Sequence, residues 1–315
     1  MEKTKILAVT GPTATGKTKI GVELAESFSG EIISCDSMQI YKGLPIGTAQ
    51  PTASELNKIK HHLVNFVEVS ENFSVSDYVK LAQKAASNIA GRGKIPILVG
   101  GTGLYLRSML QGTSFEDNHT DEEIRKSLYE LAVSKGKAAL YEQLLETDPR
   151  AAEKIHQNNV KRVVRAIEYN MVTGKLFSAQ EIKPEDSEYD YLMLCLMYRD
   201  RDKLYAKIEH RVDAMLESGL LQEAREFHEF CAGCKVTPTA AQAIGYKEIF
   251  PYFNGAVSLE TAVSNLKQAT RRYAKRQITW FKRESFVKFI YLDDYSSQKE
   301  VFKECESLVS KFIIG

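Results

Sequence analysis

The pattern of apolar and polar positions changes along the chain. In the first third, short runs rich in β-branched residues alternate with segments whose apolar residues recur every three or four positions. The short runs predict strands over Lys5–Thr10, Glu31–Cys35 and Ile95–Val99. The segments between them predict helices over Lys17–Phe28 and Ser76–Ala90. Since strands that alternate with helices form βαβ units, we predict an α/β fold in which a parallel sheet is flanked by helices.

The pattern becomes mainly helical and charged after a polar link at 113–120. Helical segments follow from Asp121 to about Gly174, and helical periodicity returns from Asp202 onward. The apolar run Tyr191–Met197 suits a strand covered on both faces, although a buried helical turn would show the same pattern. We therefore predict a core over 1–115, a helical insertion domain over 116–190 and a continuation of the core, with basic C-terminal helices, over 191–315.

Composition places the chain among ordinary globular proteins. Its 315 residues are 43% hydrophobic and 26% charged, which is enough to bury a core in one large or two modest domains. Lys and Arg number 42 against 41 for Asp and Glu, so the overall charge gives no reason to expect a polyanionic partner. Such a partner has to be argued from local clusters of charge.

The apolar runs and the cysteines bear on location. The longest apolar run, Tyr191–Tyr198, has eight residues, whereas a membrane-spanning helix needs about 20, and the first residues carry no export-signal pattern. We therefore expect no membrane partner. The five cysteines are odd in number and scattered through a chain too large to depend on disulfides, which predicts a reducing, cytoplasmic location.

A phosphate-binding pattern, G-x-x-x-x-G-K-[ST], lies between the first predicted strand and helix. Its residues are Gly11, Pro12, Thr13, Ala14, Thr15, Gly16, Lys17 and Thr18. The glycines let the backbone curl so that N–H groups point inward, and the start of the helix adds partial positive charge. Lys17 supplies an ammonium for phosphate oxygens, and the Thr18 hydroxyl suits Mg²⁺, which prefers oxygen ligands. We therefore predict a P-loop-containing core that binds a di- or triphosphate with Mg²⁺.

The P-loop alone leaves kinases, nucleotide hydrolases and diphosphate-releasing transferases open. The strand that ends at Gly100 has no terminal Asp, where many nucleotide hydrolases hold an acid; the acid at a strand end is Asp36. Ligands collect at the carboxyl ends of parallel strands, so Asp36 should face the P-loop, either to organise a magnesium water or to accept a proton. The alternative is an Asp that only caps a turn. Thr102, in the glycine-rich segment Gly100–Tyr105, offers a hydroxyl beside a close backbone approach.

These segments, in this order, resemble the tRNA dimethylallyltransferases of bacterial type, also called tRNA isopentenyltransferases. The resemblance covers nearly the whole chain and rests on Gly11–Thr18, Asp36–Tyr41, Ile46–Ala49, Gly100–Tyr105, Asp148–Pro149 with Ile155–His156, Arg162–Glu168, Thr173–Lys175 and Ala243–Lys247. It implies transfer of a dimethylallyl group from dimethylallyl diphosphate to the exocyclic N6 amine of adenine 37, next to the anticodon of tRNA, with release of diphosphate.

The resemblance also implies roles for single residues. Asp36 would be the general base for the amine, Thr102 and Arg125 would line the reaction channel, and Lys17 with Thr18 would hold the diphosphate and Mg²⁺. The chemistry is consistent with these roles. An exocyclic amine is a poor nucleophile, so removal of its proton during attack helps, and positive groups stabilise the charge that develops on the leaving diphosphate.

A cluster of cations near the C-terminus predicts an RNA-binding face. Arg271, Arg272, Lys275, Arg276, Lys282 and Arg283 have no acid among them and would form a stripe along a helix, with Tyr273, Trp280 and Phe281 interleaved. The resemblance implies a wider set in contact with the tRNA anticodon stem-loop: Asp36, Ser37, Met38, Gln39, Thr102, Arg125, Lys161, Arg162, Arg165, Gln242, Tyr246, Lys247, Arg271, Arg272, Lys275 and Arg276. We expect a monomer.

Two other functional classes fit parts of the sequence. A P-loop kinase of a nucleoside or small metabolite would explain the phosphate motif alone, and a non-catalytic RNA-binding module would explain the basic stripe alone. Cys231 and Cys234 with His228 supply three potential zinc ligands, but no fourth is evident and no second cysteine pair exists. We therefore expect no zinc site.

Overall fold

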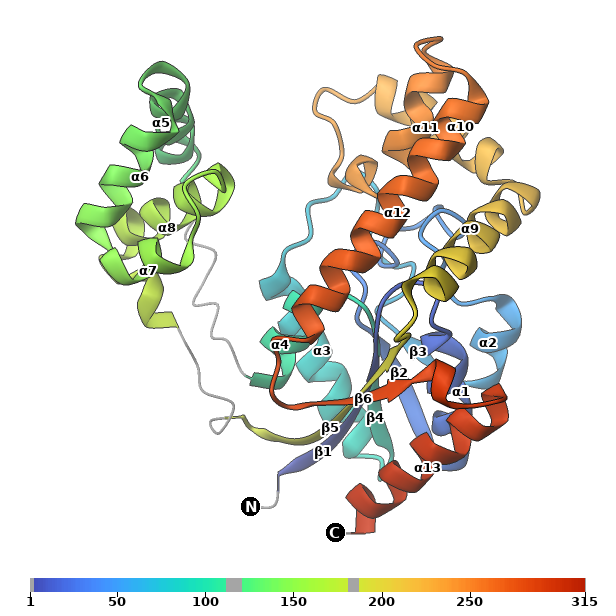
Figure 1. Cartoon of the computed structure of the whole chain (residues 1–315). Coiled ribbons are helices and arrows are strands. Elements are labelled where there is room, and N and C mark those ends of the chain that lie inside the picture. Colours follow the sequence, from blue (N-terminus) through green and yellow to red (C-terminus); the bar gives the residue numbers. More distant parts are fainter. Residues whose placement is uncertain (1–2, 112–120, 181–186, 315) are drawn as a thin grey trace. The chain divides into compact units, whose positions relative to one another are not determined.

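The computed structural model describes residues 3–111, 121–180 and 187–314, and it divides the chain into two compact units. The first unit is formed by residues 1–110 and 188–315, and the second by residues 111–187. The polar link that the sequence places at 113–120 lies outside the described residues. Figure 1 shows the elements of each unit.

The first unit is built on a six-stranded parallel sheet in the order β3-β2-β4-β1-β5-β6. Its strands are β1 (Thr4–Thr10), β2 (Gly30–Ser34), β3 (His61–His62), β4 (Ile95–Gly100), β5 (Tyr189–Met197) and β6 (Val287–Tyr291). This confirms the predicted parallel sheet. The apolar run at 191–197 is indeed a strand, because β5 pairs with β1 along Thr4–Thr10 and its last five residues are buried.

Helices cover both faces of this sheet, and some of them lie beyond the carboxyl ends of its strands. They are α1 (Lys17–Ser27), α2 (Ala53–Lys58), α3 (Val75–Ala90), α4 (Gly103–Gln111), α9 (Arg201–Glu217), α10 (Leu220–Ala232), α11 (Tyr246–Phe253), α12 (Leu259–Phe281) and α13 (Gln298–Ile314). No helix in the described ranges combines the length and the apolar content that a bilayer crossing requires.

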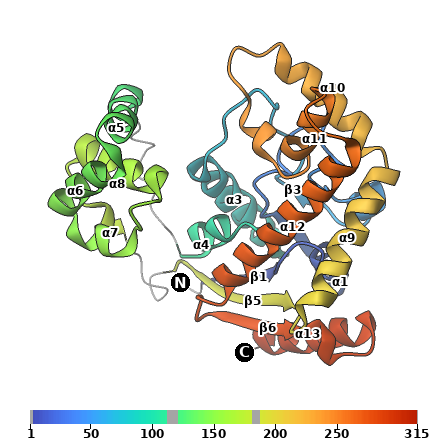
Figure 2. The same ribbon diagram turned by 45° about the horizontal axis from the view of Figure 1, so that its top comes forward.

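Two hydrophobic cores hold the first unit together. In the first core, α1 and α13 pack on the face of the sheet that carries Leu7, Ile32 and Ile97. In the second core, α9, α10, α11 and α12 pack against the loop that follows β2. Helices α9 and α12 run beside each other in both views (Figures 1 and 2). The space between these helices and the ends of the strands therefore lies within one compact unit.

The strand β6 was not predicted, because helical periodicity dominates the sequence after Asp202. It pairs with Met193–Met197 of β5 at the edge of the sheet, and of its residues only Ile290 is buried. A strand of five residues with one buried side chain carries too little alternation to be separated from the helical segments around it.

The described residues of the second unit form four α-helices. Its helices are α5 (Glu122–Ser134), α6 (Gly136–Thr147), α7 (Pro149–Lys154) and α8 (Val160–Thr173). They bury a core of their own, in which Leu144, Val163 and Ile167 are inaccessible to solvent. Asp148 caps α7 through Ala151 and also accepts the N–H of Ser178, so this carboxylate joins two segments of the unit.

Candidate active site

The P-loop forms a tight turn between β1 and α1. Gly11 has φ +140°, and a Cβ there would lie 2.2 Å from the carbonyl oxygen of Leu196, so the neighbouring strand leaves room for glycine alone. Gly16, with φ +80°, leads into α1, whose first turn has no side-chain cap. Because uncapped N–H groups at a helix start point outward and carry partial positive charge, this turn is suited to an anion.

The ammonium of Lys17 lies over this turn, where it donates a hydrogen bond to the Pro12 carbonyl at 2.8 Å. Burial and, less strongly, the nearby guanidinium of Arg211 together lower the pKa of Lys17 to about 8, although the carboxylate of Asp36 acts in the opposite direction. Burial also lowers the pKa of Arg211. Two cations that are held together at this cost imply a polyanionic ligand between them.

Asp36 follows β2 and lines the same pocket as Lys17 and Thr18. Its Oδ1 accepts the N–H of Met38 at 2.9 Å and, more weakly, that of Gln39 at 3.4 Å. The capping role that the sequence left open is therefore present. Within the described part of the chain both bonds end on Oδ1, so Oδ2 keeps its lone pairs for a ligand.

The glycine-rich segment after β4 is fastened to the Asp36 segment through its backbone. Thr102 donates its N–H to the Cys35 carbonyl at 3.2 Å and accepts the N–H of Ser37 on its hydroxyl at 3.1 Å. A Cβ on Gly100 would lie 2.1 Å from the same Cys35 carbonyl oxygen. Any side chain at Gly100 would therefore push apart the two loops that frame the pocket.

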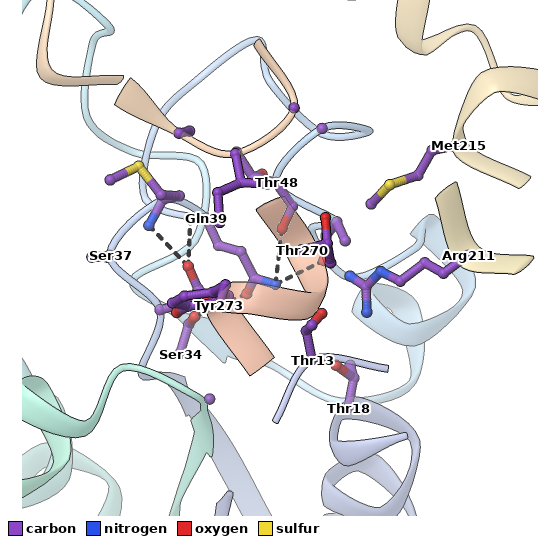
Figure 3. Close-up of a pocket in the computed structure, with 18 of the residues that line it drawn as sticks. Thr13, Thr18, Ser34, Ser37, Gln39, Thr48, Arg211, Met215, Thr270 and Tyr273 are labelled. Carbon is purple, nitrogen blue, oxygen red and sulfur yellow. Dashed lines mark hydrogen bonds between the residues drawn. The ribbon is translucent and has the colours of Figure 1, made fainter. Parts of the chain in front are cut away.

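The pocket has a volume of about 290 Å³ and lies within the first unit. In Figure 3, Arg211 and Met215 reach it from α9, while Thr13 and Thr18 lie at its P-loop end. Much of its wall is apolar and comes from α9, the start of α10, the segment before α11, and α12: Val212, Met215, Leu220, Ala243, Ile244 and Leu266. The pocket thus joins a cationic end to an apolar wall, which fits a small ligand with a charged head and an apolar tail.

Two residues of this site were not predicted from the sequence. Arg211 sits on the inner face of α9, and Gln277 lies buried on α12. The Gln277 side chain accepts the Thr13 N–H at 2.9 Å and donates to the Gly101 carbonyl at 3.0 Å, so it joins the P-loop to the glycine-rich segment. A polar residue on the apolar face of a periodic helix is the one signal that marks Gln277 in the sequence.

The basic stripe is only partly free. Arg271 pairs with Glu209 of α9 at 2.5 Å, so an acid from another helix neutralises the first cation of the stripe. Arg272, Lys275 and Arg276 are exposed, and Arg276 also lines the pocket. The helix ends at Phe281, so Lys282 and Arg283 lie at or beyond its cap.

The aromatic residues of the stripe pack inward. Phe281 is buried, and Trp280 lies against Gly103 and under the guanidinium of Arg107. Tyr273 lines the pocket.

The other predicted RNA contacts of the first unit differ in accessibility. Ser37, Met38 and Gln39 line the pocket, as do the exposed Gln242 and Lys247. Tyr246 needs correction, because its side chain is fully buried and its hydroxyl donates to Glu223 at 2.7 Å. The structure therefore gives Tyr246 no surface to present to an RNA.

In the second unit, one buried carboxylate organises the predicted cations. Glu168 is inaccessible to solvent and binds Arg125 at 3.0 Å and Arg165 at 3.4 Å. It also accepts the N–H of Asp121. Lys161 and Arg162 are exposed on the same helix as Arg165. Two guanidiniums on one carboxylate leave a net positive charge, which suits contact with an anion.

Metal ligands are sparse in the described ranges. They contain no group of three His, Cys, Asp or Glu side chains that could hold a metal ion. The donors that suit Mg²⁺ in the pocket are the Thr18 hydroxyl and the Asp36 carboxylate. Mg²⁺ typically keeps several waters and binds one or two protein oxygens together with substrate phosphates, so this donor set fits the ion in the presence of a diphosphate.

Comparison with known proteins decides the family. The model of the IPP transferase family matches residues 39–284. The chain is 45% identical to a tRNA dimethylallyltransferase of Caldanaerobacter subterraneus over 94% of its own length and 95% of that protein. The chain belongs to the IPP transferase family.

Solved structures extend this comparison to the fold. The full-length tRNA isopentenylpyrophosphate transferase of Bacillus halodurans is 40% identical, with a TM-score of 0.73 over 99% of this chain and 97% of that one. A eukaryotic dimethylallyltransferase described as acting on tRNA is 30% identical, with a TM-score of 0.83 over 98% of this chain and 80% of that one. This member of the IPP transferase family therefore has the α/β fold that its sequence predicts, and the likeness covers both of its units.

Proposed function

We propose that the chain transfers a dimethylallyl group from dimethylallyl diphosphate to the exocyclic N6 amine of adenine 37 in tRNA, and releases diphosphate. The observation that carries the proposal is the pocket in which Lys17, Arg211 and Asp36 converge, in a chain that belongs to the IPP transferase family. This pairing of a cationic end with a carboxylate matches the two ends of the reacting bond. A kinase or a purely RNA-binding module would need no such combination with an apolar wall.

The cationic end would hold the diphosphate. Lys17, Arg211 and the first N–H groups of α1 would neutralise the charge that grows on the leaving oxygen as the bond from carbon to oxygen lengthens. The allylic carbon tolerates positive charge, so departure of diphosphate is the step that needs most help. The apolar wall would hold the five-carbon group and keep water from this carbon.

Asp36 would act on the nucleophile. The lone pair of the adenine amine is delocalised into the ring, and loss of its proton to Oδ2 of Asp36 during attack would make it available. The N–H groups of Met38 and Gln39 hold Oδ1 and so fix the direction of the carboxylate. Thr102 would orient this segment through its bond to Ser37.

Mg²⁺ would bind the Thr18 hydroxyl and the diphosphate, and when bound it supplies positive charge to the leaving group. This assignment rests on the oxygen donors of the pocket. The expected signature is a requirement for Mg²⁺ in pyrophosphate binding that is lost in Thr18→Ala.

The RNA would lie over the exposed cations, with the anticodon stem-loop as the bound part. Arg272, Lys275 and Arg276 on α12, and Lys161 and Arg162 on α8, offer charge to phosphates. A loop adenine is unstacked at a cost of only about a few kcal/mol, so it can enter a pocket. We further propose that the chain acts in the cytoplasm, where tRNA is modified, and as a monomer, which sedimentation analysis would check.

The test is a single-turnover assay with unmodified tRNA, dimethylallyl diphosphate and Mg²⁺, read as mass gain on the RNA. Asp36→Asn removes the proton acceptor with little change in shape and should slow the reaction by about 10²–10⁴-fold while tRNA binding survives. Asp190→Asn, at the opposite end of β5 and exposed, is the matched control. Absence of mass gain with the native protein would refute the function, and near-native turnover of Asp36→Asn would refute the role of the carboxylate.

A further inference from the structure

A buried carboxylate outside the reacting groups, that of Glu223 on α10, has an unusual set of partners. The residue is 9% exposed. Its Oε2 accepts the N–H of Ile46 at 2.8 Å, and its Oε1 accepts the N–H of Gly47 and the hydroxyl of Tyr246, each at 2.7 Å. Among the described residues these are its hydrogen-bond partners, and all three are uncharged. Since no cation that the structure describes pairs with this buried acid, its role is to accept hydrogen bonds from these three donors rather than to form a salt bridge.

The two backbone donors belong to a short turn over 44–50. In this turn Thr48, Ala49 and Gln50 donate their N–H groups to carbonyls three to five residues earlier. The N–H groups of Ile46 and Gly47 come before these donors and have no acceptor within the turn, as at the start of any helical turn. Glu223 satisfies both, so it fixes the turn from outside, across 176 residues of sequence.

The 44–50 turn is hydrogen-bonded to the segment that contains Asp36 and Gln39. The carbonyls of Thr48 and Ala49 accept the side-chain amide of Gln39, at 3.5 and 2.7 Å. Figure 3 shows Gln39 and Thr48 in the pocket wall. The backbone N–H of Gln39 donates to Oδ1 of Asp36. A continuous chain of hydrogen bonds therefore runs from Glu223 through the turn and Gln39 to the carboxylate.

The ring of Tyr246 completes this arrangement. A Cβ on Gly47 would lie 2.5 Å from the Tyr246 hydroxyl oxygen and ring, so the turn rests directly on the phenol. Burial raises the pKa of the Tyr246 phenol, and the carboxylate of Glu223 raises it further, so the hydroxyl remains a donor. A glutamine in place of Glu223 would have one acceptor oxygen and would turn an NH₂ group toward one of the three donors.

From this geometry we infer that Glu223 is a positioning residue: it acts through the 44–50 turn and Gln39 to set the direction of Asp36 toward the RNA base. The inference rests on the proposed function. Tyr246 has the same role, because its hydroxyl binds Glu223 and its ring lies against Gly47. Because the P-loop, Lys17 and Arg211 take no part in this chain of bonds, loss of Glu223 should affect use of the RNA and leave binding of the diphosphate group intact.

The experiment compares Glu223→Gln with Glu226→Gln, an exposed acid one turn away on the same helix whose hydrogen bond is to Gln222. We expect Glu223→Gln to lower kcat/KM for tRNA about tenfold or more, the effect of one lost charge-assisted hydrogen bond. The Kd for inorganic pyrophosphate with Mg²⁺, measured by calorimetry, should stay within about twofold of native. Glu226→Gln should match the native protein in both.

A second variant keeps the test valid if Glu223→Gln fails to fold. Tyr246→Phe keeps the ring against Gly47 and removes one hydrogen bond, so it should show the same split between tRNA use and pyrophosphate binding with a smaller loss, about two- to fivefold. Parallel loss of both properties, or native kcat/KM in both variants, would overturn the inference. Inactive native protein would instead refute the proposed function, so the two failures are distinguishable.

Discussion

Binding of a diphosphate should draw a proton into the pocket. Burial and Arg211 hold the pKa of Lys17 at about 8, against 10.5 for an ordinary exposed lysine. The difference corresponds to about 3 kcal/mol for charging this side chain in the folded state. A polyanion between Lys17 and Arg211 reverses the repulsion and raises the pKa of Lys17 again. At pH 8 about half of the Lys17 side chains are neutral, so binding should take up about half a proton per site.

Calorimetry in buffers of different ionisation enthalpy measures this uptake. Pyrophosphate is titrated at pH 8 into the native protein and into Lys17→Arg, whose guanidinium stays charged at this pH. Subtraction of the second value from the first removes protons that belong to pyrophosphate or to other groups. The excess uptake should fade toward pH 6, where Lys17 is already charged, and above about pH 10.5, where it is neutral in both states.

The same shift predicts how stability depends on pH. Between about pH 8 and 10.5 the unfolded chain binds more protons at this position than the folded one, so native stability should rise with pH in that window, and the full cost of the charged side chain is present below it. Lys17→Met should lack the rise and should be more stable than the native protein at pH 7, by at most about 3 kcal/mol. Equal proton uptake by the native protein and Lys17→Arg would refute the reasoning.

Three further predictions concern packing, RNA and acid stability. Gly100→Ala forces a methyl group onto the Cys35 carbonyl and should cost about 1–3 kcal/mol in urea unfolding; an unchanged midpoint would contradict this. Arg272→Ala should weaken tRNA binding and lower the slope of log K against log salt by about 1, and an unaltered slope would mean that the side chain meets no phosphate. Arg92 donates hydrogen bonds to Glu31 and holds the pKa of its carboxyl well below the usual range. The carboxylate therefore stabilises the fold above about pH 4.5, and this contribution is lost as the pH falls through the lowered pKa. Glu31→Gln should therefore cost about 2 kcal/mol at pH 7 and progressively less in acid, whereas a cost independent of pH would count against the pairing.

Local patterns predicted the elements that carry many buried residues. The strands β1, β2, β4 and β5 each have several consecutive buried positions, and their apolar runs mark them. The meeting of Asp36 with the P-loop also follows from sequence, because parallel strands bring their carboxyl ends to one edge. The edge strand β6, with one buried residue, could not be predicted in this way.

Contacts between distant segments set the rest of the site. Arg211 resembles any other polar residue of its helix until α9 is placed over the P-loop. Gln277 is marked only by its place on the apolar face of α12, and its bond to the P-loop appears only in the structure. Tyr246 was assigned to RNA on resemblance, and only the packing of α11 against the turn at Gly47 shows that it is buried. Burial and pairing of polar groups depend on tertiary neighbours, which periodicity does not encode.

The order of the strands has a consequence for how the chain is made. β1 is synthesised before the other described strands of the sheet, yet its neighbour on one side is β5, which ends at Met197. At about 5–20 residues per second, this apolar strand waits roughly 10–40 s for that partner, while all four helices of the second unit are synthesised. The second unit, by contrast, is one continuous stretch and can condense as soon as it emerges. Chaperone demand during translation should therefore fall on this first strand.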